Sequence, residues 1–203
     1  QTACCMKPVL LLVSCLAITL QGRAQVPYVP AKNAIQIGTD YLDVDPANGL
    51  KYRFAFDYRR YMARDQIALG LSVGFMGSQR ETVLIPDLVS VGKNTRQRIT
   101  VDLTASYNLL HSVHHALRIG GGPSAWYTND DLFVKVTPYP VSTGTPVYAE
   151  RRFTRTWAIG GHGLIEYTYA LAFNTQVSLH TGTVLIGPSG FSPLFGLRAG
   201  YRF

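Results

Sequence analysis

The chain has 203 residues, of which 47% are hydrophobic and only 15% are charged, and its formal net charge is +7. This length suits one domain, but charged residues make up about a quarter of a typical soluble domain, so an ordinary soluble surface is disfavoured. No uninterrupted apolar run of about 18 residues follows the N-terminal region, which argues against a transmembrane helix. Two classes remain: an unusually apolar soluble β protein, or a β-barrel that spans a membrane.

The first part of the chain has the pattern of an export signal. Lys7 supplies a positive charge, residues 8–20 form an apolar core, and a small-residue cleavage site ends at Ala24. We therefore predict that residues 1–24 are upstream residues plus a signal peptide. An alternative is a lipobox-like run that ends at Cys15 and would make that cysteine a lipidated N-terminus.

Cleavage after Ala24 would remove all three cysteines, so the mature chain would have no disulfide, thiol chemistry or cysteine metal site. It would also remove Lys7 and Arg23, which lowers the net charge from +7 to +5. The remaining basic residues are spread singly along the chain, so nucleic acid is not an expected partner. Residues 25–33, which contain two prolines, are predicted to be a lead-in segment.

From residue 34 onward, apolar and polar residues alternate, and this period of two indicates β-strands. The clearest internal run lies between Leu50 and Tyr58, where Leu and aromatic residues alternate with Lys, Arg, Ala and Asp. Eight strands are predicted within a single domain over residues 34–203. Their expected ranges are 35–41, 50–61, 66–76, 96–109, 116–127, 154–169, 173–185 and 193–203.

The connections between these strands alternate in length. Those near 62–65, 110–115 and 170–172 are short, whereas 77–95 and 128–153 are expected to be long loops. Every second connection of an up-and-down sheet lies at the same end, so the long loops gather at one end and the tight turns at the other. This arrangement predicts an all-β fold, an eight-stranded antiparallel up-and-down transmembrane β-barrel.

The polar strand face distinguishes a membrane barrel from a soluble, lipocalin-like one. It carries glycines such as Gly70, Gly74 and Gly196 with scattered Arg and Asp, whereas a face in water would carry bulky polar residues. Small residues with a few charges suit the narrow interior of an eight-stranded barrel. The apolar face would then contact lipid, where only a closed barrel lets strands pair every backbone group.

Aromatic residues mark both ends of the apolar strand faces, as expected at two lipid–water interfaces. The belt at the periplasmic rim is predicted at Tyr58, Tyr61, Tyr107, Tyr167, Tyr201 and Phe203. The belt at the outer rim is predicted at Tyr41, Tyr52, Phe75, Tyr127, Trp157 and Phe195.

Ionisable residues on the polar face would be enclosed in the lumen. Because an unpaired buried charge is costly, we expect them to form a paired network that acts as a structural plug. The alternative is a charged path for ions. The predicted lumen network consists of Asp40, Lys51, Arg53, Asp57, Arg59, Arg98, Asp102, Arg118, His162, Glu166, Arg198 and Arg202.

A hydrolytic site can be imagined on two neighbouring predicted strands. His162 and Glu166 share one strand, and Ser178 and His180 lie on the next, so all four would face inward. Inward groups of a packed barrel do not reach lipid, and hydrogen bonding within the lumen is the favoured interpretation.

The remaining motifs do not predict a metal-binding or phosphate-binding site. His111, His114 and His115 share a predicted turn, but no carboxylate or cysteine adjoins them, so exposed histidines are expected instead of a metal site. The Asp130-Asp131 pair could bind calcium, although a solvated loop is the simpler interpretation. The run over 91–95 lacks the residues of a phosphate loop. The sequence thus predicts no catalytic residue, cofactor or metal.

The final strand has apolar residues at every second position from Phe195 to Phe203, the last residue of the sequence. It resembles the C-terminal strand of Gram-negative outer-membrane barrels, which ends in Phe with an aromatic residue, here Tyr201, two positions before it. Residues 34–203 resemble the small eight-stranded outer-membrane proteins of the OmpA-transmembrane-domain and OmpX-like group. The resemblance implies location in the outer membrane, contact with its lipid or lipopolysaccharide, a monomeric state, and recognition of Tyr201 and Phe203 by the barrel insertion machinery.

The expected function is that of a non-enzymatic integral barrel whose outer loops, chiefly 77–95 and 128–153, make surface contacts. Three alternatives stay open: a narrow pore for small solutes, a lipid-modifying outer-membrane enzyme, and a soluble secreted barrel. The sequence does not identify a ligand, because a fold hosts many functions.

Overall fold

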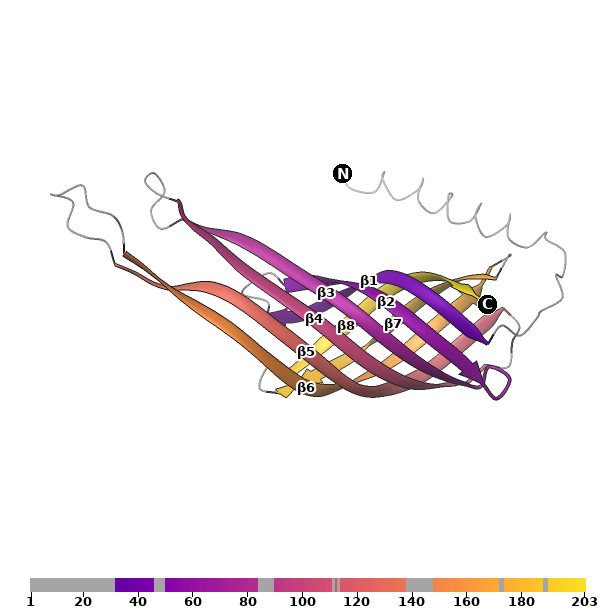
Figure 1. Cartoon of the computed structure of the whole chain (residues 1–203). Helices are drawn as coiled ribbons and strands as arrows, with labels where there is room; N and C mark the ends of the chain where they lie inside the picture. The colour runs from indigo at the N-terminus through magenta and orange to yellow at the C-terminus, as the bar shows by residue number, and fades with distance from the viewer. Residues whose placement is uncertain are drawn as a thin grey trace, which may run out of the picture.

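The computed structural model describes residues 32–45, 50–83, 90–110, 112, 114–137, 148–171, 174–187 and 190–203. They form one closed barrel of eight antiparallel strands in sequence order (Figure 1), which confirms the predicted fold class. The expected signal segment, residues 1–24, lies outside the described residues. The strands are β1 (Asn33–Asp45), β2 (Leu50–Met62), β3 (Ile67–Val83), β4 (Ser90–Asn108), β5 (His115–Thr137), β6 (Tyr148–Ala170), β7 (Thr175–Ile186) and β8 (Gly190–Arg202).

The barrel closes where the first strand meets the last. β1 pairs with β8 from Ala34 opposite Arg202 to Leu42 opposite Leu194. Asn33 and Phe203 complete this seam, because the amide of each donates to the carbonyl of the other, at 2.9 and 2.8 Å. Every strand therefore has two partners through the barrel wall, as strands in lipid require.

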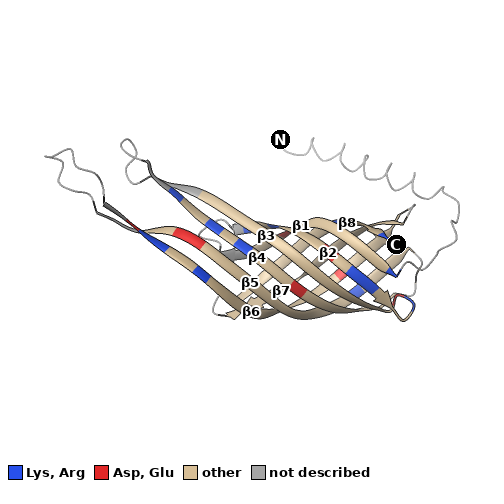
Figure 2. Cartoon of the chain, in the orientation of Figure 1, with Lys and Arg blue, Asp and Glu red and all other residues tan. Residues whose placement is uncertain are grey.

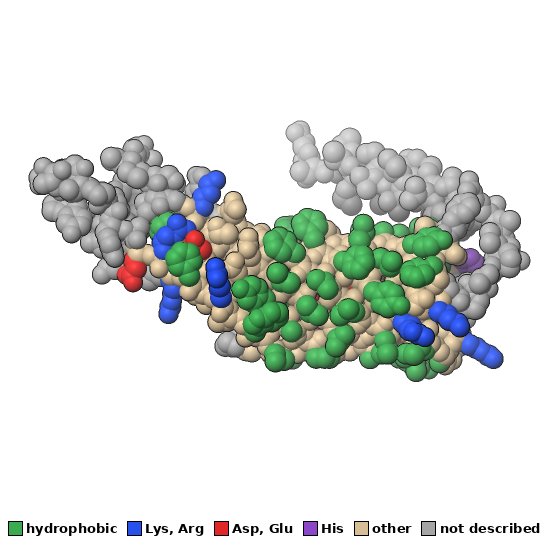
Figure 3. Space-filling model, in the orientation of Figure 1, with side chains coloured by type: hydrophobic (Ala, Val, Ile, Leu, Met, Phe, Trp, Pro, Cys, Tyr) green, Lys and Arg blue, Asp and Glu red, His purple; other side chains and the backbone are tan. Residues whose placement is uncertain are grey.

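The two strand faces have the polarity predicted for a membrane barrel. On β2, Arg53 and Asp57 are buried inside, whereas Phe54 and Phe56 are exposed on the outer wall. The same alternation runs around the barrel, so apolar side chains cover the middle of the wall in Figure 3, and the cationic side chains seen on that face lie toward its two ends. Among the described residues there is no helix that is long and apolar enough to cross a membrane.

The predicted long loops, 77–95 and 128–153, are largely strands, which corrects the sequence interpretation. β3 and β4 stay paired up to Val83 opposite Ser90, and β5 and β6 up to Thr137 opposite Tyr148. β4 and β5 are joined as far as Thr95 opposite Asp131. β3 to β6 thus project together beyond the other four strands (Figure 1) as a sheet that we call the outer sheet.

Aromatic side chains lie at both ends of the outer wall, as predicted, with the exception of Tyr61. Tyr61 was expected at the periplasmic rim, but it is 4% exposed and packs inside the barrel with Ala34 and Ala68. The reason is its odd number: the inward positions of β2 are odd, and the outward Tyr58 is even. At the outer rim the rings of Tyr127 and Trp157 are in contact, with centroids 5.1 Å apart.

Candidate functional site

The interior of the barrel holds a chain of alternating acidic and basic side chains. At its outer end, Arg53 on β2 donates from Nη1 to Asp102 on β4 at 2.6 Å. The same guanidinium donates from Nη2 and Nε to Asp40 Oδ2 on β1, at 2.5 and 2.8 Å. Asp40 Oδ2 also accepts from Arg198 Nη2 on β8 at 3.2 Å. One carboxylate thereby joins β1 to both of its neighbours, at the seam where the barrel closes.

The chain of ion pairs continues toward the end opposite the outer sheet. Arg198 donates to Asp57 on β2, whose Oδ2 lies 4.0 Å from Arg59 Nη2. Arg59 then forms a two-pronged ion pair with Glu166 on β6, in which Nη2 donates to Oε2 at 2.5 Å. Glu166 Oε1 lies 3.7 Å from Arg118 Nη1 on β5. These contacts cross the lumen, because β2 and β6 are on opposite sides of the barrel.

The charges of this chain balance. Four carboxylates alternate with four guanidinium groups, and all eight side chains are buried. Such a chain avoids the large desolvation penalty of a lone charge in a low-dielectric interior. The side chains in contact order are Asp102, Arg53, Asp40, Arg198, Asp57, Arg59, Glu166 and Arg118.

Four residues of the predicted network lie apart from this chain. Arg98 pairs with Asp130 at the outer end, and Arg202 Nη2 donates to Asp65 at 2.5 Å at the periplasmic end. His162 Nε2 lies 2.8 Å from Thr104 Oγ1, and its Nδ1 lies 2.9 Å from Ser124 Oγ. Lys51 is half-buried on β2, and within the described part of the chain no ion pair joins it to the network.

A buried apolar cluster fills the interior on the outer side of the ion-pair chain, where the sequence predicts a polar lining. All six buried members point inward from the outer parts of their strands, where a polar face was expected. The inward positions of β3 and β5 have even numbers, so the even numbers of Met76 and Trp126 already indicate that both side chains point inward. We call these residues the apolar cap: Leu42, Met76, Trp126, Val184, Ile186 and Leu194.

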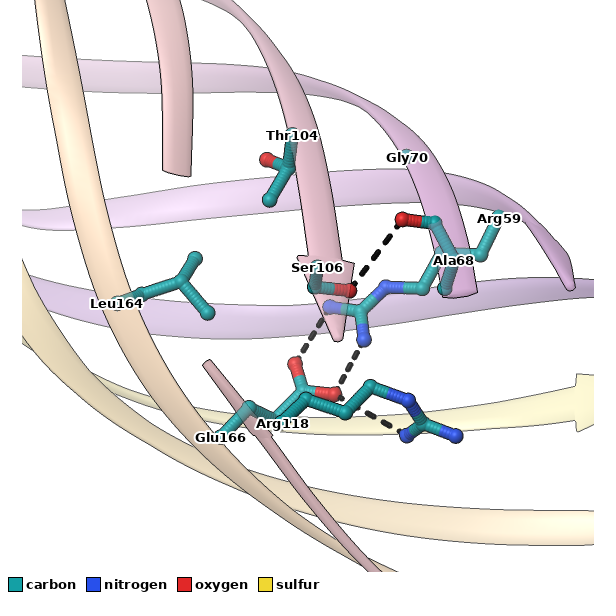
Figure 4. Close-up of a pocket in the computed structure, with 8 residues that line it drawn as sticks. All are labelled: Arg59, Ala68, Gly70, Thr104, Ser106, Arg118, Leu164 and Glu166. Carbon is teal, nitrogen blue, oxygen red and sulfur yellow. Dashed lines mark hydrogen bonds and ion pairs between the residues drawn. The ribbon is translucent and has the colours of Figure 1, made fainter. Parts of the chain in front are cut away.

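Small cavities adjoin the charged side chains. One of about 20 Å³ is lined by Asp65, Arg118 and Arg202 at the end opposite the outer sheet. Another, of about 10 Å³, lies beside the Arg59–Glu166 pair (Figure 4). That volume is about what one water molecule needs. In the close-up, Arg59 and Arg118 point toward Glu166 from different strands, and Ser106 Oγ donates to the Ala68 carbonyl at 3.3 Å.

At the end opposite the outer sheet, the Tyr61 side chain is buried inside the barrel. Its ring lies under two cations, 5.0 Å from the Arg118 guanidinium carbon and 4.3 Å from that of Arg202. Its hydroxyl accepts from Gln176 Nε2 at 3.3 Å. Cation–π contacts of this kind are favourable when the cation is desolvated. The misassigned Tyr61 is therefore a contact point for two of the predicted lumen arginines.

The imagined hydrolytic residues have other partners. Ser178 Oγ accepts from Gln36 Nε2 at 3.2 Å and lies 3.0 Å from Thr168 Oγ1. His180 Nε2 lies 3.0 Å from Asp40 Oδ1, and His162 contacts Ser124 instead of Ser178. His162, Glu166 and Ser178 thus form hydrogen bonds inside the lumen, and His180 faces Asp40 there.

The candidate metal groups do not assemble in the described part of the chain, where no cluster of three ligating side chains occurs. His111 lies outside the described residues, and His115 Nδ1 lies 2.6 Å from the Tyr167 hydroxyl. Asp130 and Asp131 are on strand β5 and not in a solvated loop, so their side chains point to opposite faces. Each pairs with its own arginine, Asp130 with Arg98 and Asp131 with Arg151.

The outer sheet carries a second concentration of charge (Figure 2). On its outward face, Arg151 donates to both oxygens of Asp131, at 2.9 and 2.6 Å, and lies over the Phe133 ring at 4.7 Å. Arg155 is exposed on the same face, and Arg152 is exposed on the opposite face. The sheet therefore presents cations both toward the barrel axis and away from it.

Comparison with known proteins places the fold. No known family description and no curated protein matches the chain. Neisserial surface protein A is similar with a TM-score of 0.56 and 12% identity, over 84% of this chain and 97% of that one. The N-terminal β-barrel domain of Pseudomonas aeruginosa OprF has a TM-score of 0.54 and 13% identity, over 85% of this chain and 98% of that one. Yersinia pestis Ail, the attachment invasion locus protein, in complex with the heparin analogue sucrose octasulfate, has a TM-score of 0.53 and 14% identity, over 86% of this chain and 100% of that one. The chain has the fold of these small eight-stranded outer-membrane barrels.

Proposed function

We propose that this chain is a non-enzymatic integral barrel of the outer membrane, whose lumen is closed to solutes and whose outer sheet makes surface contacts. The observation that carries the proposal is the filled interior. The apolar cap, the eight-membered ion-pair chain and Tyr61 follow one another along the lumen. Because a packed interior leaves no solute path, the outer sheet is the part of the molecule that can meet other molecules.

The last strand supports assembly in the outer membrane. Tyr201 and Phe203 are both exposed on the outer wall at the periplasmic rim. They are accessible before the strand is covered by lipid, as a signal read by the insertion machinery must be. Full pairing of β8 with β1 and β7 within the chain supports a monomer.

A narrow pore is the second candidate. It is favoured by the polar lining of the middle of the lumen, where the ion-pair chain runs from Asp102 to Arg118. Rearranged ion pairs could then open a charged path. The two candidates differ in conductance across a planar lipid bilayer, which only the pore would show.

Location and orientation can be tested by cysteine labelling in intact cells. All native cysteines lie at positions 4, 5 and 15, and the described barrel contains none. Arg152→Cys places a thiol on the outer sheet, and His114→Cys places one in the turn between β4 and β5. We expect a membrane-impermeant maleimide to label only Arg152→Cys in intact cells, and both variants after permeabilisation.

The unsubstituted chain is the control for background labelling. Labelling of His114→Cys alone would mean that the barrel is inverted. Recovery of both variants in the soluble fraction without detergent would contradict the membrane location. Heat-modifiability on detergent gels checks that each variant is folded.

A further inference from the structure

We propose that the outward face of the outer sheet binds the phosphorylated headgroup of an outer-leaflet lipid, just above the outer aromatic belt, with Arg155 as the central cation. The inference rests on the proposed function, because it needs the barrel to span the outer membrane with the outer sheet outside. It adds a defined binding site, the residues that would hold the ligand, and the phosphate as the group that they recognise.

The position of the site follows from strand register. Trp157 on β6 and Tyr127 on β5 are Cα partners, and their contacting rings mark the lipid–water interface. The next outward pair toward the strand tips is Arg155 opposite Asn129. Two residues of a strand rise by about 6.6 Å, so Arg155 lies one layer above the belt, at headgroup depth.

The chemistry of this layer suits a phosphate group. Asn129 Nδ2 donates to Gln97 Oε1 at 3.2 Å, which holds two amide side chains beside Arg155 on three adjacent strands. Among the described residues, no acidic side chain pairs with Arg155. A guanidinium group can donate two parallel hydrogen bonds to a phosphate, and amide groups can add further donors.

The layer above favours a lipid over a soluble anion. Phe153 is 68% exposed on the same face, which is unfavourable in water. Arg151 is neutralised by Asp131 and packs on Phe133, so it does not compete with Arg155 for an anion. Cations and exposed apolar side chains adjoin on this part of Figure 3. A lipid whose acyl chains lie along the barrel wall would offer a phosphate to Arg155 and the apolar side of its sugars to Phe153.

The opposite face of the same strand supplies a matched control. Arg152 is equally an exposed arginine on β6, but it points toward the barrel axis and does not continue the lipid-facing wall. A nonspecific effect of positive charge would involve both arginines. A headgroup site above the belt would involve Arg155 alone.

The test is native mass spectrometry of the full chain in detergent micelles, titrated with lipid A bisphosphate and with its dephosphorylated form. We expect wild type to bind the phosphorylated form about tenfold more tightly, as one charge-assisted contact implies. Arg155→Gln should abolish this preference, and Arg152→Gln should retain it. Phe153→Ala should weaken binding of both forms to a similar extent.

Equal binding of the two lipid forms by wild type would overturn the proposal, and so would equal loss in Arg152→Gln and Arg155→Gln. Loss of soluble heparin binding in Arg155→Gln, with lipid A binding unchanged, would instead assign the site to a polyanionic partner and overturn the lipid assignment. Heat-modifiability shows whether each variant is folded. Conductance and cysteine labelling test the proposed function separately, so its failure can be told from failure of this site.

Discussion

Arg59 on β2 and Glu166 on β6 form a two-pronged ion pair between strands on opposite sides of the barrel. Both side chains are buried, and Glu166 also accepts from Thr168 Oγ1 at 3.0 Å. The pair therefore spans the lumen as a strut. Its energetic role can be tested by removing one partner.

Glu166→Gln should destabilise the barrel strongly, because it leaves the charges of Arg59 and Arg118 without their shared carboxylate. Breaking a buried pair in this way costs about 3–5 kcal/mol. The loss should appear as a lower urea midpoint for the gel shift of the folded band. The matched control is Asp131→Asn, which breaks the more exposed pair with Arg151 and should cost less than about 1 kcal/mol. Equal midpoints for the two variants would show that the strut contributes nothing.

Gly196→Ala should disturb the ion-pair chain at Asp40. A Cβ at Gly196 would clash with the Asp40 carboxylate and would lie 2.5 Å from His180 Nε2. Overpacking of this kind costs about 1–3 kcal/mol. Gly163→Ala is the control, since a Cβ there meets no atom within 4 Å. The urea midpoint of unfolding should be lower for Gly196→Ala than for Gly163→Ala and wild type. The reverse order of midpoints would show that the interior is not crowded at Gly196.

The two tryptophans report on opposite faces of the wall. Trp126 is 2% exposed in the apolar cap, and Trp157 is 66% exposed on the outer wall. In Trp157→Phe, the remaining Trp126 fluorescence should resist quenching by acrylamide from water. In Trp126→Phe, Trp157 should be quenched by brominated lipid. Efficient acrylamide quenching of Trp126 would mean that water reaches the cap and that the lumen is open there.

His162→Ala should loosen the wall between β4 and β5. Ladder pairing is interrupted between Asp102 opposite Ser124 and Ala105 opposite Gly121, next to Pro123, which has no amide hydrogen to donate. His162 bridges this interruption by contacting Thr104 and Ser124. We expect faster hydrogen exchange at 103–106 in His162→Ala. The control is His115→Ala, whose partner Tyr167 is exposed, and it should leave that segment unchanged. Unchanged hydrogen exchange at 103–106 in His162→Ala would show that His162 does not stabilise this part of the wall.

The sequence predicted the parts of the fold where the outer wall is apolar. There, apolar side chains outside and polar side chains inside alternate along each strand, as between Leu50 and Tyr58. The strands beyond the outer belt were mistaken for loops because residues 78–82 and 128–131 are all polar. Without an apolar face, a period of two does not show in residue type, although the backbone still pairs.

The alternation of odd and even positions along each strand predicted which residues face inward. It did not predict which side chains they contact. The contact between Arg59 and Glu166 depends on strand register around the whole barrel, and one sequence gives no measure of that register. The odd position of Tyr61 on β2 and the even position of Trp126 on β5 both correspond to the inward face. His180 beside Asp40 was identified as inward, but its pairing with β1 depends on closure of the barrel, which joins the first strand to the last.

Single-channel recording in planar lipid bilayers measures whether the lumen is closed to ions. Purified, folded wild-type protein should give no discrete conductance steps, while a porin added afterwards to the same bilayer should give them. Reproducible steps from wild type that differ in Glu166→Gln would contradict the account, since they would show that ions pass along the Asp–Arg chain.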